Sequence, residues 1–183
     1  MAALHPWQRL QADPALLDDF APLWRLVEAV RECRNVRAEA AAIAARAPSH
    51  ADCQVIALQL MNVHQALRET IETGTRVGRE SGYGSVIAGR RVSLGSDDGF
   101  TDFLSYLVSL GADACKRILS DPESAMPPRK WAHFGKGHDG GWRPRQREGF
   151  VHYALSEYCE ESYPGAPRVD ALWVEQWYGR PAA

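Results

Sequence analysis

The sequence predicts a mainly α-helical protein, a single helical domain over residues 1–183 with five to seven helices. Three observations indicate this class. Residues 23–47 are rich in the helix formers Ala, Glu and Arg, an apolar stripe with helical spacing runs through residues 51–73, and helix start and stop signals recur along the chain. The length of 183 residues fits one domain, and 45% hydrophobic against 24% charged residues is the ordinary balance of a globular protein.

The first helical segments are predicted from their boundary residues. Asp13, followed by proline, is a typical helix start, because its carboxylate can accept a hydrogen bond from a free backbone N–H group. Pro22 interrupts or restarts this helix, and the helix formers of residues 23–47 follow it. Asn35 is a candidate break inside this stretch, and Pro48 ends it.

The longest helix is expected over residues 51–73, with Ser49 as its cap and Gly74 as its stop. Its apolar residues recur at intervals of three or four and form one stripe: Ile56, Leu60, Val63, Leu67 and Ile71. His64 lies at the edge of this stripe. We interpret it as a partly buried histidine bonded to a neighbour rather than as a catalytic residue.

Residues 74–95 form the first of two irregular segments and are rich in glycine and arginine. They are compatible with a long loop, a short hairpin or a broken helix. At most one hairpin is expected, near residues 84–94, where β-prone residues occur. The signal for phosphate binding is weak, because the segment lacks the P-loop ending and the Gly-x-Gly-x-x-Gly spacing after a strand.

The next helix is predicted to start at Ser96, whose hydroxyl can accept hydrogen bonds from the first free N–H groups. Asp97 and Asp98 then lie near the positive end of the helix dipole. The buried face is predicted to contain Phe100, Phe103, Leu104, Leu107, Val108 and Leu110. We expect Gly111 to end or bend the helix, and Asp121, followed by proline, to start a turn.

Residues 126–149 form the second irregular segment, in which aromatic residues are interleaved with an excess of basic ones. The basic residues are Arg129, Lys130, Lys136, Arg143, Arg145 and Arg147, and the tryptophans are Trp131 and Trp142. Helix is expected to resume near Arg145, with an apolar stripe of Val151, Ala154, Leu155 and Tyr158. A short last helix is expected to carry Val169, Leu172, Trp173 and Gln176 on one face.

Three short motifs stand in order along the chain: Leu-Trp-Arg-Leu-Val at 23–27, Ser-Asp-Asp-Gly-Phe at 96–100 and Leu-Ser-Asp-Pro at 119–122. Together they resemble a family of small bacterial proteins known only as a domain of unknown function, and the resemblance covers residues 20–124. It implies a mostly helical fold and no particular activity.

The chain also departs from the pattern of that family. Ser93 and Leu94 stand where the family has Gly-Gly, and Leu104, Tyr106 and Leu110 replace an Arg, a Trp and a Gln. The role that those family residues have is therefore not expected in this chain.

Asp97 and Asp98 are candidate site residues. Two adjacent carboxylates can share a hard cation, but acidic side chains at a helix start also stabilise the helix without a metal, by roughly 0.3–1 kcal/mol each. We interpret them as capping residues and keep a ligand-binding or catalytic role open. A zinc site is a further candidate, formed by His133, His138, Asp139 and His152. Their spacing does not match the helix-borne His-Glu-x-x-His pattern, so a solvent-exposed loop is favoured over a metal site and metal binding is left open.

The cysteines are expected to be structural. The four are Cys33, Cys53, Cys115 and Cys159. None forms a Cys-x-x-Cys pair, so a zinc ribbon or a redox motif is not indicated. Each is expected within a helix as a free, buried thiol.

Trp131, Trp142, Arg143 and Arg145 are the predicted binding residues of the second irregular segment. Trp and Arg dominate protein–protein hot spots, whereas the same cations and aromatics can also hold the phosphates and bases of a nucleic acid. The formal net charge of -2 gives no general electrostatic argument for nucleic acid or membrane.

We therefore predict a non-enzymatic protein-interaction module, by analogy of the immunity or regulatory type. One alternative is a small-molecule or metal-binding enzyme that uses Asp97 and Asp98; another is nucleic-acid binding by residues 129–147. No catalytic motif decides whether the protein is an enzyme. The partner, any cofactor and the oligomeric state are left open.

A cytoplasmic protein is expected. No apolar run reaches the ~20 residues needed to cross a bilayer. Residues 1–10 lack a basic region followed by an apolar core, so no secretory signal is indicated.

Overall fold

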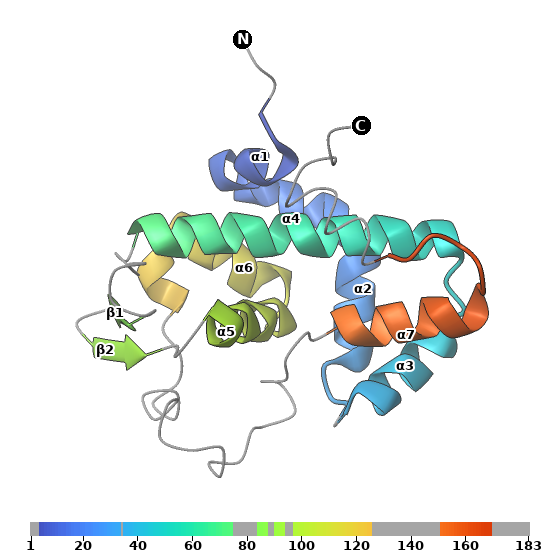
Figure 1. The fold of residues 1–183 in the computed structure, drawn as a ribbon. Coiled ribbons are helices and arrows are strands. Elements are labelled where there is room, and N and C mark those ends of the chain that lie inside the picture. The colour runs from blue at the N-terminus through green and yellow to red at the C-terminus, as the bar shows by residue number, and fades with distance from the viewer. Residues whose placement is uncertain are drawn as a thin grey trace, which may run out of the picture.

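The computed structural model describes residues 4–33, 35–74, 84–87, 90–93, 97–125 and 151–169, and of residues 84–87, 90–93 and 97–99 it describes the backbone alone. Within these residues the chain forms seven α-helices, two short 3-10 helices and one pair of strands (Figure 1). The mainly α-helical class and the helix number expected from the sequence are confirmed.

The N-terminal part of the chain folds into four short helices: α1 (Pro6–Ala12), the 3-10 helix η1 (Pro14–Phe20), α2 (Ala21–Val30) and α3 (Val36–Ala44). Asp13 caps η1, because its carboxylate accepts a hydrogen bond from the Ala15 N–H at 3.1 Å. Asn35 caps α3 in the same way and accepts from the Ala38 N–H at 2.7 Å. The helix start at Asp13 and the break at Asn35 are thus confirmed.

Helix α4 (His50–Gly74) is the longest element of the described chain. Ser49 and Asp52 close its first turn: the Ser49 hydroxyl donates to the Asp52 carboxylate at 2.6 Å and accepts from the Asp52 N–H at 3.2 Å. All five residues of the predicted apolar stripe are buried, with at most 4% of any of them exposed. The helical spacing in the sequence therefore identified the face that α4 turns to the core.

The strand pair and the C-terminal helices follow: β1 (Gly84–Ile87), β2 (Arg90–Ser93), α5 (Asp97–Ser109), α6 (Ala112–Ser120), the 3-10 helix η3 (Pro122–Ala125) and α7 (His152–Ser162). The strands pair antiparallel, with Gly84 opposite Ser93, so the first irregular segment contains a hairpin where the β-prone residues predicted one. Gly111 separates α5 from α6 at a φ of 93°, which strongly favours glycine.

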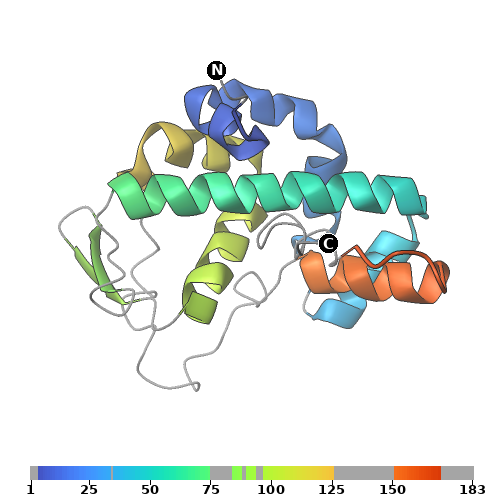
Figure 2. The same ribbon diagram turned by 45° about the horizontal axis from the view of Figure 1, so that its top comes forward.

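Helix α4 runs through the middle of the molecule, and α1, α2, α5, α6 and α7 pack along it, whereas α3 packs against α7 and α2 (Figures 1 and 2). Helices α2, α3 and α7 gather at its N-terminal half. Helices α5 and α6 lie at its C-terminal half, and α1 crosses a different side. This arrangement gives five of the other described α-helices the same central partner.

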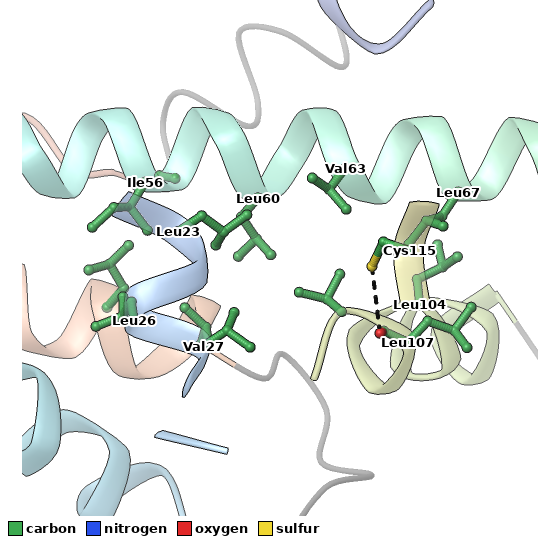
Figure 3. Packing of buried hydrophobic residues seen from close by; sticks show 14 of the residues in the cluster. Leu23, Leu26, Val27, Ile56, Leu60, Val63, Leu67, Leu104, Leu107 and Cys115 are labelled. Atoms are coloured by element: carbon green, nitrogen blue, oxygen red, sulfur yellow. Dashed lines mark hydrogen bonds between the residues drawn. The ribbon is translucent and has the colours of Figure 1, made fainter. Parts of the chain in front are cut away.

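The core follows from this arrangement. In Figure 3, Leu23, Leu26 and Val27 of α2 lie beside Ile56 and Leu60 of α4. Further along the same helix, Val63 and Leu67 lie beside Leu104, Leu107 and Cys115. Full burial of one such aliphatic side chain stabilises the fold by about 1.5–3 kcal/mol relative to exposure. One continuous cluster of buried residues therefore holds the described helices together.

Three expectations need correction. Cys33 lies outside a helix and is half-buried, because α2 ends at Val30 and the chain turns before the Asn35 cap. His64 is not partly but almost completely buried, at 2% exposed. Leu110 is only partly buried, because it follows the last residue of α5.

Two other expectations fall on residues outside the described part of the chain. They are the start of the helix near Arg145 and the last helix after Val169. Within the described part, α7 begins at His152, and its predicted stripe of Val151, Ala154, Leu155 and Tyr158 is buried. No described helix is both long and apolar enough to cross a membrane.

Candidate functional site

Arg68 connects α4 to the first turn of α5, where the Ser-Asp-Asp-Gly-Phe motif continues into the helix. Its guanidinium donates to the Thr101 hydroxyl at 3.1 Å and lies over the Phe100 ring, 5.0 Å from the centroid. The same group lies 3.7 Å from the carboxylate of Glu72, one turn further along α4. Arg68 thus fixes the start of α5 against the central helix.

The charge of Arg68 is compensated inside the protein. Its side chain is 13% exposed and that of Glu72 is 16% exposed, so the pair is largely removed from water. A largely buried cation with a carboxylate, a hydroxyl and an aromatic face around it is well stabilised. With its charge compensated in this way, Arg68 is better suited to hold the start of α5 against α4 than to bind an anion.

His64 lies one turn before Arg68 on α4. Burial lowers the pKa of His64 to about 3, and interactions with His152 of α7 and with Arg68 add to this effect. The ring is therefore neutral at pH 7, and it is a poor general acid or base in that range. The structure supports the interpretation of His64 as a structural histidine.

A buried carboxylate meets the start of α7. Glu39 of α3 is 1% exposed, and its carboxylate accepts a hydrogen bond from the Val151 N–H at 3.4 Å. Val151 is itself buried and has a φ of 69°, a conformation that costs a β-branched residue of order 1–3 kcal/mol. The contact with Glu39 and the burial of the side chain hold this strained turn, which directs His152 and Tyr153 into α7.

Polar residues thus link the helices at three points. Glu39 of α3 accepts from the backbone at the start of α7, His64 of α4 interacts electrostatically with His152 of α7, and Arg68 of α4 donates to Thr101 of α5. The sequence analysis named His64 and, as a candidate zinc ligand, His152, and it missed the other three residues. A signal was present, because His64, Arg68 and Glu72 are spaced by four residues and so share one face of α4.

The structure describes the predicted binding residues only in part. Asp97 and Asp98 are the first residues of α5, as expected, and their side chains lie outside the described atoms. Trp131, Trp142, Arg143 and Arg145 lie outside the described residues, as do His133, His138 and Asp139. The roles of all these residues therefore stay predictions.

Metal ligands and reactive thiols were also considered. Among the residues that the structure describes, no three His, Cys, Asp or Glu side chains are grouped as metal ligands would be. Burial raises the pKa of Cys115 to about 12, and its thiol lies 3.7 Å from the Leu107 carbonyl oxygen (Figure 3). This thiol is protonated at neutral pH and therefore unreactive.

Two exposed apolar features stand out in the described part of the chain. Tyr153, in the first turn of α7, is 46% exposed and lies against the ring of His152, with 5.3 Å between the centroids. Val55 and Leu58, one turn apart on α4, are 46% and 37% exposed. Aromatic residues with an apolar body and a polar tip are common anchors in protein interfaces.

Comparison with known proteins finds no match to this chain among family models, curated proteins or solved structures. The resemblance of residues 20–124 to the Ser-Asp-Asp-Gly-Phe family therefore stays a prediction.

Proposed function

We propose that this protein is a non-enzymatic interaction module that binds a protein partner, in the manner of an immunity or regulatory protein. The observation that carries the proposal is the exposure of Tyr153 at the start of α7. In the sequence it follows directly on the basic aromatic segment with Trp131, Trp142, Arg143 and Arg145. Tyr, Trp and Arg are the residue types that contribute most to protein–protein affinity.

The strained turn at Val151 also supports the proposal of a binding surface at the start of α7. Backbone strain of this kind persists only where the surrounding structure maintains it, and it is concentrated at functional positions. Here the strain is retained at the junction between the basic aromatic segment and α7, next to the exposed tyrosine. A rigid α7 would give the segment a fixed anchor beside the partner.

The chemistry of the partner follows from the sequence of the segment. Six basic residues between positions 129 and 147 are opposed by few acidic ones. A complementary surface carries carboxylates around an apolar centre that receives the aromatic side chains. The proposed partner is therefore a protein whose binding surface has an apolar centre surrounded by acidic residues.

The first experiment recovers the tagged protein from its native cells, with and without nuclease treatment, and identifies the proteins bound to it. The identified partner is then purified, and its dissociation constant is measured by calorimetry. Substitution of Trp142 and Arg143 by Ala, and separately of Tyr153 by Ala, should weaken binding at least about tenfold each. Partner affinity should also fall with rising salt.

A matched control distinguishes the surface at Tyr153 from the exposed side of α4. Substitution of Val55 and Leu58 by Ser removes comparable exposed apolar area from α4 and should leave affinity within about twofold. Wild-type affinity in the Trp142/Arg143 and Tyr153 variants would refute the proposed interface. Recovery of nucleic acid in place of a protein would refute the protein-partner proposal and favour the nucleic-acid alternative.

A further inference from the structure

The last described residues lie beside the first half of α4. After α7 the chain turns back, and the ring of His50, the first residue of α4, donates to the Pro167 carbonyl at 2.9 Å. Val169, the last described residue, is 2% exposed and lines a surface pocket together with Ser156 and Cys159 of α7. The chain therefore continues into residues 170–183 from a point held against α7 and close to the start of α4.

Met61 of α4 is buried outside the main core. It lies about 100° around the helix from Leu60 and about 160° from Val63, the nearest members of the apolar stripe. It shares a side of α4 with Leu58, three residues earlier, which is 37% exposed, whereas Met61 itself is 1% exposed. In the described part of the chain, Met61 does not belong to the cluster of buried residues that joins the helices. The group that buries this methionine therefore has to be sought outside that cluster.

The composition of residues 170–183 suits them to cover a methionine. They include one basic residue, Arg180, and five large apolar or aromatic residues. The five are Leu172, Trp173, Val174, Trp177 and Tyr178. Residues 126–150 carry six basic residues, and residues 75–83 are rich in glycine and arginine, so both are less suited to cover an apolar side chain.

The segment is also long enough to reach Met61. Met61 lies eleven residues beyond His50, which is about 16 Å along the helix axis at about 1.5 Å per residue. Residues 170–178 span about 13 Å as a helix and about 30 Å when extended. From Pro167, which contacts His50, the aromatic residues of the segment can therefore reach the middle of α4.

We propose that residues 170–183 pack along the side of α4 that carries Leu58 and Met61, as a strap that joins α7 to the middle of the central helix. Val169 and Trp173 are four residues apart and share a face in the helix that the sequence predicts here. Because Val169 is already buried against α7, this face continues onto α4. The thioether of Met61 packs favourably against an aromatic ring, and the Trp173 indole supplies one.

The first test places a photoreactive side chain in the full chain by the substitution Leu58→p-benzoylphenylalanine. After irradiation, peptide mapping locates the covalent link, and a mixture of isotope-labelled and unlabelled protein distinguishes links within one chain from links between two copies. We expect links within one chain to residues 170–183. The same probe in place of Asp113 on α6, whose side chain is 93% exposed, should give no link to that segment. Links to residues 75–83 or 126–150, links between two copies, or the absence of any link would each overturn the proposal.

The second test measures how fast hydrogen peroxide oxidises Met61 to its sulfoxide, by mass spectrometry of the peptide that contains it. Leu172→Ser combined with Trp173→Ser should raise the native rate at least about tenfold, because loss of two apolar side chains weakens the strap over the methionine. Glu175→Ser, in the same segment but off that face, should leave the rate within about twofold. An unchanged rate in a double variant with native circular dichroism would refute the strap, and the cross-link decides the question if that variant fails to fold.

Discussion

The burial of His64 should make the stability of this protein depend on pH below 7. Burial, together with His152 and Arg68, lowers its pKa from 6.5 to about 3. Below pH 6.5 the unfolded chain therefore binds a proton at this ring that the folded protein excludes, so the folded state loses relative stability as pH falls. With these two pKa values, linkage predicts a decrease of about 2 kcal/mol in the free energy of unfolding between pH 7 and pH 5.

The measurement is urea unfolding at pH 7, 6 and 5, followed by circular dichroism and tryptophan fluorescence. His64→Gln removes the titrating ring, so its loss of stability over this range should be smaller than that of the wild type by about 2 kcal/mol. His5→Gln, which replaces an exposed histidine, should keep the wild-type pH dependence. If the wild type and His64→Gln lose the same free energy of unfolding between pH 7 and pH 5, the predicted effect of burial on the pKa of His64 is wrong.

Three further predictions concern stability, each measured by urea unfolding at pH 7. Gly74→Ala should destabilise the protein by about 1–3 kcal/mol, because a Cβ there would overlap the Pro122 ring; an unchanged midpoint would mean that η3 moves away freely. Asn35→Ala should cost about 1 kcal/mol through loss of the α3 cap, and Asn35→Asp, which keeps an acceptor, should not. Leu60→Ala should cost about 2–5 kcal/mol, whereas Leu58→Ala on the exposed side of α4 should cost under about 1 kcal/mol; equal losses would contradict the assigned core face.

The sequence predicted the elements whose cause is local. Asp13 and Asn35 cap helices because their side chains reach backbone groups two or three residues away. The stripe on α4 was identified because side chains three and four apart share a helix face. The hairpin was left as one of three alternatives, because short glycine-rich segments carry little periodic signal.

The candidate site was predicted much less completely. The side chains of Asp97 and Asp98, and the residues Trp131, Trp142, Arg143 and Arg145, lie outside what the structure describes, so their proposed roles still rest on residue type. Tyr153, which carries the proposed function, was not singled out. Composition gives no measure of exposure, and a tyrosine has an apolar ring that can be buried as well as a hydroxyl that can face water.

By itself, the sequence determined the helical class, the core face of α4 and the helix starts at Asp13 and Asn35, because hydrogen bonds and periodicity within a few residues control them. Only the tertiary structure decided that Glu39 meets Val151, that Arg68 meets Thr101 and that His64 is buried. The partners in these contacts are separated by tens of residues. Their proximity depends on how the helices pack around α4, and local propensity carries no information about such packing.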